Sequence, residues 1–379
     1  MSRLINPFKS FKRYLLNIPG WRTSRKIVIF ESDDWGSIRM PSKEVFDELK
    51  YLGIKVDNLS FNQYDSLASE EDLMRLFEVL SSVKDKNGNP AVLTANTIVA
   101  NPDFEKIRAS NFAEYYYEPF TSTLNRYPAH AKSFTLWKEG ISRGIFKPQF
   151  HGREHLNVAR WMRALQNDSG LARRAFNFEM FDLSESLEIS EKSFMDTYNF
   201  QSENELLIQI QSIKEGLELF EQLFGYKSIT FIAPCNIWSN KLNQALYDMG
   251  VNTLKTGWIQ LEPKPGSENK FRKIFHYIGQ RNNLGQRYLP RNAHFEPSQN
   301  PSFDYKNDIL SRAEIAFHCG KPLIIGTHRL NFIGFIDKLN REQNLLLLSE
   351  LLKELIKTWP DVEFMSADEL AKLMSKNKN

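Results

Sequence analysis

Cysteine is scarce in this chain, which has 2 cysteines, Cys235 and Cys319, among 379 residues. Two cysteines cannot build a disulfide framework, and they fit a protein of a reducing compartment. A run of about 18 apolar residues is also missing, so we expect no transmembrane helix. The first residues contain no apolar stretch followed by small residues, so we expect no secretory signal and a cytoplasmic location.

Excess charge of one sign is missing as well. The 49 Lys and Arg residues nearly balance the 46 Asp and Glu residues, and a net charge of +3 is too small to indicate a nucleic-acid partner. The chain contains no internal repeat and no low-complexity tract, which argues against a repeat architecture. Its composition, 41% hydrophobic and 25% charged, is that of an ordinary globular protein long enough to bury a sizeable core.

The N-terminal segment departs from this even charge balance. Residues 1–30 contain 7 basic residues and no acidic ones, with aromatic residues and leucines between them. Two interpretations are open: a basic amphipathic arm on an anionic membrane surface, or a helix packed on the domain with its basic face in solvent. We expect residues 1–25 to form this arm, which would place the protein at the inner face of the membrane, and residues 26–379 to form a single catalytic domain.

Short apolar runs alternate with segments of helical periodicity along the remainder of the chain. Predicted strands include residues 26–31, 228–233 and 322–327, and predicted helices include residues 43–52, 70–83, 205–224 and 341–358. This alternation predicts an α/β fold with a parallel sheet and outer helices, and about seven such units fit a closed or nearly closed barrel. Residues 260–305, rich in Pro, Asn and Gly, are expected to be a long insertion of loops.

Two adjacent carboxylates, Asp33 and Asp34, follow the first predicted strand directly. Because side chains alternate along a strand, the two carboxylates should point in different directions. One could then bind a metal ion while the other faces a substrate. A helix-capping role in the loop after the strand is the alternative, since Asp is common in turns and caps.

A pair of histidines, His151 and His155, follows another predicted strand. Residues four apart share one face of a helical turn, so both imidazoles should reach one ion. Together with Asp34 they would form an open zinc site that leaves a position for water. The alternative is two unrelated polar loop residues.

Two further polar clusters also follow predicted strands. Residues 231–236 run through Ala-Pro into a polar loop, whose backbone N–H groups could stabilise an oxyanion near Cys235. His328 directly follows the strand 322–327, at the mouth of the expected barrel, where it could act as a general acid. A capping or core histidine is the alternative for His328.

The order of these clusters resembles the polysaccharide deacetylases, also called carbohydrate esterase family four. The resemblance extends over residues 26–370, although only short motifs support it. It implies a distorted (β/α)7 barrel that removes N- or O-acetyl groups from sugars. The matched motifs imply one divalent ion, with zinc favoured, and these roles: base Asp33, acid His328, and metal ligands Asp34, His151 and His155.

The chain departs from the family pattern at two motifs, one of which, carrying an Asp that pairs with a base-orienting Arg, has no clear counterpart here. Ile232 stands where the family has an Arg that orients the base, and Cys235 stands near the place of a tyrosine whose N–H binds the oxyanion. Arg153 and Arg291 are the two candidates to replace the missing Arg.

The expected substrate is an acetylated sugar within a larger glycan or its precursor, and no nucleic acid. Trp35 and Trp238 lie close to the clusters in sequence, and their rings could stack on a sugar. Two other functions stay open. A glycoside hydrolase would need a second carboxylate beside Asp33, such as Glu179 or Glu296, and a non-catalytic carbohydrate-binding relative would explain the missing Arg.

Overall fold

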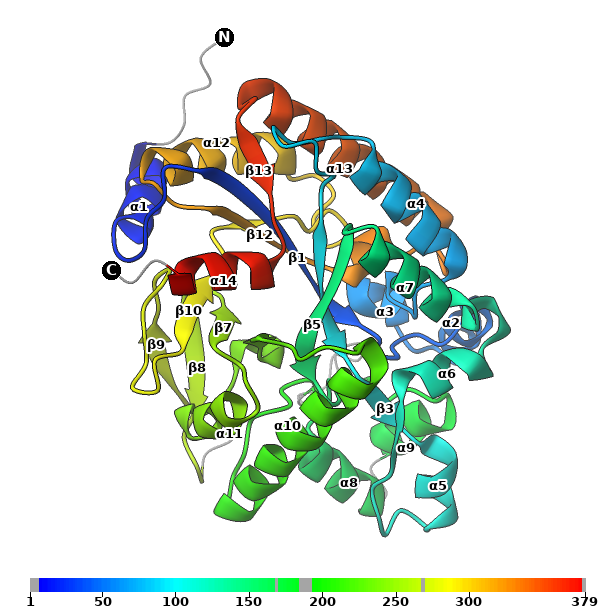
Figure 1. Ribbon diagram of the computed structural model, residues 1–379. Coiled ribbons are helices and arrows are strands. Elements are labelled where there is room, and N and C mark those ends of the chain that lie inside the picture. The colour runs from blue at the N-terminus through cyan, green and yellow to red at the C-terminus, as the bar shows by residue number, and fades with distance from the viewer. Residues whose placement is uncertain (1–6, 168–169, 184–192, 267–269, 377–379) are drawn as a thin grey trace.

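The computed structural model describes residues 7–167, 170–183, 193–266 and 270–376, and its central element is a parallel β-sheet (Figure 1). The sheet has 9 strands in the order β10-β7-β6-β5-β2-β1-β12-β11, with β13 paired to β1. Every strand pair in it is parallel. The strands are β1 (Lys26–Trp35), β2 (Leu93–Ile98), β5 (Phe146–Gly152), β6 (Thr230–Ile232), β7 (Thr253–Thr256), β10 (Arg287–Pro290), β11 (Ala293–His294), β12 (Leu323–His328) and β13 (Val362–Phe364).

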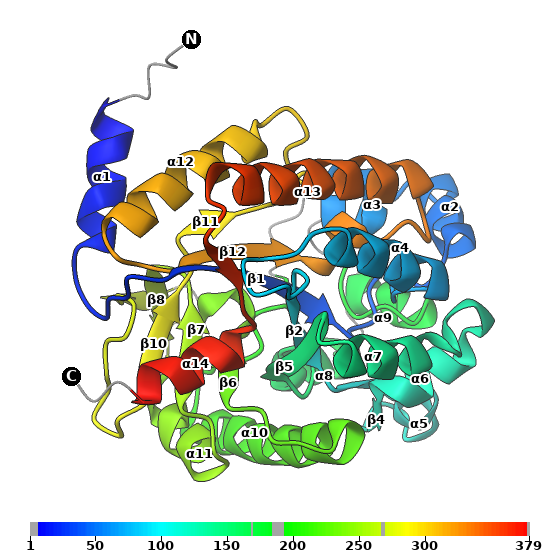
Figure 2. The ribbon, with the colours of Figure 1, turned by 45° about the horizontal axis from the view of Figure 1, so that its top comes forward.

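The two end strands of the sheet are consecutive in the sequence, and this closes the sheet into a ring (Figure 2). β10 pairs with β7, and only Arg291 and Asn292 separate it from β11, which pairs with β12. The N–H of Arg291 donates to Thr256 O (2.9 Å), and that of Asn292 donates to Ile324 O (3.1 Å). β10 and β11 together occupy one position of the ring, and β13, which pairs with one end of β1, is not counted as a position. The 9 strands therefore make the distorted β/α barrel with seven positions that the sequence predicted.

Helices surround this ring. They are α1 (Pro7–Asn17), α2 (Lys43–Tyr51), α3 (Ser60–Tyr64), α4 (Glu70–Ser81), α5 (Phe104–Ala109), α6 (Phe120–Arg126), α7 (Ser133–Ser142), α8 (Val158–Gln166), α9 (Gly170–Asn177), α10 (Glu203–Phe224), α11 (Asn243–Asp248), α12 (Tyr305–His318), α13 (Lys338–Thr358) and α14 (Ala367–Lys376). Of these helices, α3 and α14 lie at the two ends of the ring. Several helices begin at side-chain caps; Ser69, for example, forms a capping box with Asp72 at the start of α4. None of the described helices is both long and apolar enough to cross a bilayer.

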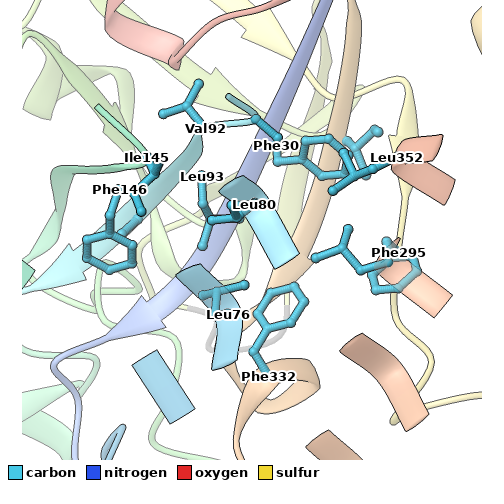
Figure 3. Packing of buried hydrophobic residues seen from close by; sticks show 14 of the residues in the cluster. Phe30, Leu76, Leu80, Val92, Leu93, Ile145, Phe146, Phe295, Phe332 and Leu352 are labelled. Atoms are coloured by element: carbon cyan, nitrogen blue, oxygen red, sulfur yellow. The ribbon is translucent and has the colours of Figure 1, made fainter. Parts of the chain in front are cut away.

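The largest apolar cluster lies between the outer face of the sheet and the helices α4, α7 and α13. Val28 and Phe30 of β1 point outward into it, and Figure 3 shows Phe30 among residues of α4, β2, β5 and α13. Burial of each such side chain contributes about 1.5–3 kcal/mol. Because side chains alternate, Ile27 and Ile29 of β1 point inward, where they pack with α14 at the amino end of the barrel. The inward side of β1 continues with Glu31 and Asp33.

The segment 260–305 differs from the predicted long loops. Its described residues contain the antiparallel hairpin of β8 (Ile259–Pro263) and β9 (Phe271–Phe275), and then the barrel strands β10 and β11. The prediction was wrong because β10 and β11 have 4 and 2 residues, too few to show a period of two. Their positions are set by pairing with β7 and β12.

The N-terminal arm forms helix α1, which packs against α12 (Figure 1). Arg13 forms an ion pair with Asp308, and the Tyr14 ring meets the His318 ring edge to face at 5.9 Å. Residues 1–6 of the predicted arm lie outside the described residues. The division into an arm of residues 1–25 and a domain of residues 26–379 therefore stays a proposal.

Candidate active site

The two adjacent carboxylates at the end of β1 contact different partners. The backbone of Asp34 has φ 72°, in the left-handed region, and the pairing of β1 with β2 shifts register between Ser32 and Trp35. This irregularity interrupts the strict alternation of the strand, so both carboxylates lie at the barrel mouth. Asp33 faces the inside of the ring, and Asp34 faces the carboxyl end of β5.

Asp34 meets both predicted histidines there. Its Oδ1 lies 3.3 Å from His151 Nε2 and 3.3 Å from His155 Nε2, and one ligand atom from each of the three residues lies within 4.8 Å of the others. Bonds of about 2.0 Å to a tetrahedral ion separate neighbouring ligand atoms by about 3.3 Å. The three buried side chains therefore fit the ligand set of one divalent ion.

The orientation of His151 is fixed by a second contact. Its Nδ1 lies 2.8 Å from the carbonyl oxygen of Ile232, the last residue of β6. A carbonyl can only accept, so Nδ1 carries the proton and Nε2 presents its lone pair toward Asp34. This is the outer contact that metal-binding imidazoles usually make. Ile232 takes part through its backbone.

The prediction that the two histidines share a helical turn was wrong. His151 belongs to β5, and His155 lies in the loop before α8, which begins at Val158. Gly152 turns the chain with φ 149°. A larger residue would be crowded at this position, because its Cβ would lie 3.1 Å from Glu154 O. The loop brings His155 back to the end of β5. Its buried Nδ1 has no hydrogen-bond partner among the described residues.

The charge states of these groups suit a cation. Burial alone would raise the pKa of Asp34, but the surrounding positive charge, including that of His328 and Arg39, outweighs it and holds that pKa well below its usual range. Burial lowers the pKa of His155 to about 3, although the Asp34 charge opposes the shift. At neutral pH the carboxylate is therefore ionised and the imidazole neutral, as ligands of a divalent ion must be.

Asp33 is held by Arg291, from the gap between β10 and β11. Arg291 Nη1 donates to Asp33 Oδ2 (2.7 Å), Nη2 donates to Oδ1 (2.6 Å), and Nε donates to Glu31 Oε2 (2.9 Å). Asn96 Nδ2 donates to Asp33 Oδ1 (2.6 Å). Burial would raise the pKa of Asp33, but the charge and hydrogen bonds of Arg291 outweigh it and hold the pKa far below its usual value.

Two interior residues complete this arrangement. Lys255 of β7 donates to Asn96 Oδ1, which leaves the Asn96 amide nitrogen to donate to Asp33. Burial lowers the pKa of Lys255 to about 8, against the charge of Glu31. Gly326 of β12 makes room for the arginine, because a Cβ at that position would lie 2.4 Å from Arg291 Cδ.

His328 lies opposite Asp33 on the neighbouring strand. The two residues are in register between β1 and β12, and His328 Nε2 is 3.8 Å from Asp33 Oδ2. Glu296 Oε1 lies 2.7 Å from His328 Nδ1. Burial would lower the pKa of His328, but the charge and hydrogen bond of Glu296 outweigh it and raise the pKa to about 10. A protonated imidazole therefore faces an ionised carboxylate at neutral pH.

The other predicted site residues lie around this centre or away from it. Trp35 and Trp238 are each only 1% exposed, so a sugar cannot stack on their rings in this structure. Arg153 donates to Glu154 Oε1 (2.5 Å), pairs with Glu215 and covers the Tyr117 ring, so of the two arginine candidates only Arg291 contacts Asp33. Cys235 is exposed in the turn after β6, with φ 56°.

Sequence reasoning did not find Asn96 and Lys255, and it named Glu296 only for a different reaction. Lys255 stands in the short strand Thr-Leu-Lys-Thr, residues 253–256, and a lysine inside a predicted strand is the one signal that could have indicated an interior charge. For Asn96 and Glu296 the sequence carries no such signal, because only the pairing of β2 with β1 and of β11 with β12 brings them to Asp33 and His328.

Comparison with known proteins yields similarities only among solved structures. No protein-family model matches the chain, and no curated protein matches it. The chain is similar to a putative polysaccharide deacetylase from Mycobacterium smegmatis, with 12% identity, coverage of 95% of this chain and 94% of that chain, and a TM-score of 0.46. It is also similar to a probable polysaccharide deacetylase from Pseudomonas aeruginosa PAO1, with 9% identity, coverage of 94% and 93%, and a TM-score of 0.45.

A third similar structure is a 4-alpha-glucanotransferase from Thermococcus litoralis. The identity is 10% and the TM-score is 0.45. The alignment covers 92% of this chain but only 40% of the glucanotransferase, so the chain spans less than half the length of that protein.

Proposed function

We propose that this chain is a metal-dependent hydrolase that removes an acetyl group from an acetylated sugar. The observation that supports it best is the convergence of Asp34, His151 and His155 on one point, beside a second carboxylate and a protonated imidazole. Two imidazoles and one carboxylate favour zinc, although nickel, cobalt and manganese accept the same ligands.

The protein side chains divide the proton transfers between them. A bound divalent ion would supply an acidic water and polarise the acetyl carbonyl. Asp33, kept ionised by Arg291, accepts the proton of the attacking water as the C–O bond forms. His328 donates a proton to the leaving sugar nitrogen or oxygen as its bond to the acetyl carbon breaks, and acetate and the free amine or alcohol are the products. The N–H groups near Cys235 are the proposed additional donors to the oxyanion.

The site also has an aromatic side chain that could contact a sugar in place of the buried tryptophans. The partly buried Phe61 ring of α3 meets the His328 ring edge to face at 5.2 Å. The Arg39 guanidinium lies 5.0 Å from the centre of the same ring. We propose that Phe61 and Arg39 border the position of the leaving sugar, since they lie beside the group that would protonate it.

Metal content and acetate release test this function. Purified wild-type protein should hold one equivalent of a divalent ion and release acetate from an acetylated amino-sugar oligomer. His151→Ala should lose both the ion and the activity. The matched control is His318→Ala, at an exposed histidine on α12, which should keep both. Equal metal content in wild type and His151→Ala would refute the metal site, and metal-loaded protein without acetate release would refute the deacetylase.

The alternative of a glycoside hydrolase has less support. That reaction needs two carboxylates with a glycosidic bond between them. Glu296 contacts the opposite nitrogen of the His328 ring from the one that faces Asp33, so an imidazole occupies the space between these carboxylates. The other nominated carboxylate, Glu179, contacts different residues. It accepts a hydrogen bond from the Tyr127 hydroxyl and lies 3.8 Å from Arg126 Nη2.

The alternative of a non-catalytic binding relative loses its main argument. That argument was the missing motif Arg, and Arg291 contacts Asp33 from another strand. Cleavage of a glycosidic bond without acetate release would favour the glycoside hydrolase. Sugar binding with neither cleavage nor acetate release would favour the non-catalytic carbohydrate-binding relative.

A further inference from the structure

A large cavity is lined by none of the residues of the proposed metal site. Its volume is about 760 Å³, and Trp21, Arg22, Tyr277, Arg281 and Arg287 are among the residues that line it. The segment after α1 forms one side of it, because the N–H of Trp21 donates to Ile278 O (2.8 Å). The cavity thus joins the N-terminal segment to the residues before β10.

The three arginines carry positive charge that no neighbouring carboxylate balances. None of them forms an ion pair with a described residue; Arg22 donates to Ile18 O (3.0 Å), and Arg287 Nη1 lies 3.5 Å from Gly279 O. Arg281 and Arg287 face each other across an antiparallel bridge, where like charges are destabilising. Burial and the Arg281 charge lower the pKa of Arg287. An anion in the cavity would offset this repulsion.

Helix α1 and Ile18, the residue after it, present an apolar stripe next to this cavity, which we call the α1 stripe. Phe11, Leu15 and Ile18, spaced four and three residues apart, are 61%, 50% and 51% exposed. Lys12 is exposed beside them. The opposite side of the helix is held on α12 through Arg13, so the stripe stays outward. Large apolar side chains rarely gather on a surface that contacts only water.

The hairpin β8–β9 extends the same surface. Phe275 is 66% exposed and Tyr277 is 38% exposed. Figures 1 and 2 both place α1 and this hairpin on the same side of the barrel. Apolar side chains thus flank the arginine cavity from two elements.

We propose that the α1 stripe and the arginine cavity together form a docking surface for an anionic lipid bilayer. The apolar side chains would enter the headgroup boundary, and the arginines would hold phosphate-bearing headgroups. An exposed apolar helix face beside basic side chains is the combination by which interfacial helices bind anionic bilayers. A soluble phosphate ligand would need the cavity but would leave the apolar stripe without a role. This proposal does not depend on the proposed reaction.

Vesicle flotation of the full chain tests the proposal. Vesicles of phosphatidylcholine with an equal amount of phosphatidylglycerol should bind the protein, and vesicles of phosphatidylcholine alone should not. Arg281→Gln should weaken binding about fivefold, the effect of one basic residue near a charged surface. Leu15→Glu should weaken it by about tenfold or more, because an apolar side chain is lost from the bilayer boundary.

Two matched controls carry the same substitutions elsewhere. Arg75→Gln changes an exposed arginine of α4, and Leu207→Glu changes a leucine of α10 that is 61% exposed. Both should bind vesicles as wild type does, and all four variants should keep activity on a soluble substrate. Equal binding to both vesicle types, or equal losses in the controls, would overturn the proposal. So would thermal stabilisation by inorganic phosphate that depends on Arg281 in a protein that binds no vesicles.

Discussion

Replacement of Arg291 by Gln should destabilise the barrel and reveal how the base is held. In the wild type, the Arg291 side chain is 7% exposed. Its guanidinium donates three hydrogen bonds, at 2.6, 2.7 and 2.9 Å, to the buried carboxylates of Asp33 and Glu31. Removal of one partner of a buried ion pair leaves uncompensated charge and costs about 3–5 kcal/mol. We expect the free energy of unfolding at neutral pH to fall by that amount.

The pH dependence of this loss follows from the pKa of Asp33. In the wild type this pKa lies below its unfolded value of about 3.9, so the carboxylate stabilises the fold above that pH and the contribution fades as the pH falls further. In Arg291→Gln the largest interactions that oppose burial are lost, and only the Asn96 hydrogen bond and the charge of the imidazoles, His328 among them, still oppose it, so the pKa of Asp33 should rise toward or above the unfolded value. Protonation then relieves the buried charge, and the difference between the two proteins should shrink as the pH falls toward about 4.

Urea unfolding followed by tryptophan fluorescence measures these free energies. Arg75→Gln is the matched control, because Arg75 pairs with Glu78 at 3.2 Å on the surface and exposed pairs contribute about 0–1 kcal/mol. The double variant Asp33→Asn/Arg291→Gln should lose less than the sum of the single losses, by about 1 kcal/mol or more. A loss below about 1 kcal/mol in Arg291→Gln, or strict additivity in the double variant, would refute the reasoning.

Two further substitutions test the residues of the proposed reaction. Asp33→Asn should lower kcat by about 100-fold or more while metal content is retained; near-wild-type turnover would remove Asp33 from the mechanism. Glu296→Gln should lower the pKa of His328 from about 10 toward its usual 6.5, because the largest charge that opposes burial is lost and only Asp33 and Asp34 still oppose it. The basic limb of the pH–rate profile should therefore move to lower pH, and an unchanged limb would show that His328 is not the acid. The stability contributed by protonated His328, present below about pH 6.5 and lost as pH rises through about 10, should shrink in the same variant.

Local signals in the sequence were enough for the longer barrel strands and for the aspartates and histidines at their ends, but not for β10 and β11. Short apolar runs such as residues 26–30 and 323–325 can be buried only as strands or helix cores, and the flanking helical periodicity favours a parallel sheet. The carboxyl ends of parallel strands meet at one edge. For that reason Asp34 and His151, 117 residues apart, could be placed together before the fold was known.

Ring closure and burial were decided only by the tertiary structure. Arg291 reaches Asp33 across 258 residues because β10 pairs with β7 while β11 pairs with β12, and those strands are too short to carry a pattern of their own. Trp35 ends β1 and Trp238 lies after β6, as ligand-binding residues would, but Trp35 packs on Trp137 of α7 and Trp238 stacks on His276. The alternation of residues along a strand predicts which side chains share one of its faces. The packing of distant elements on that face determines which of those side chains can contact a ligand.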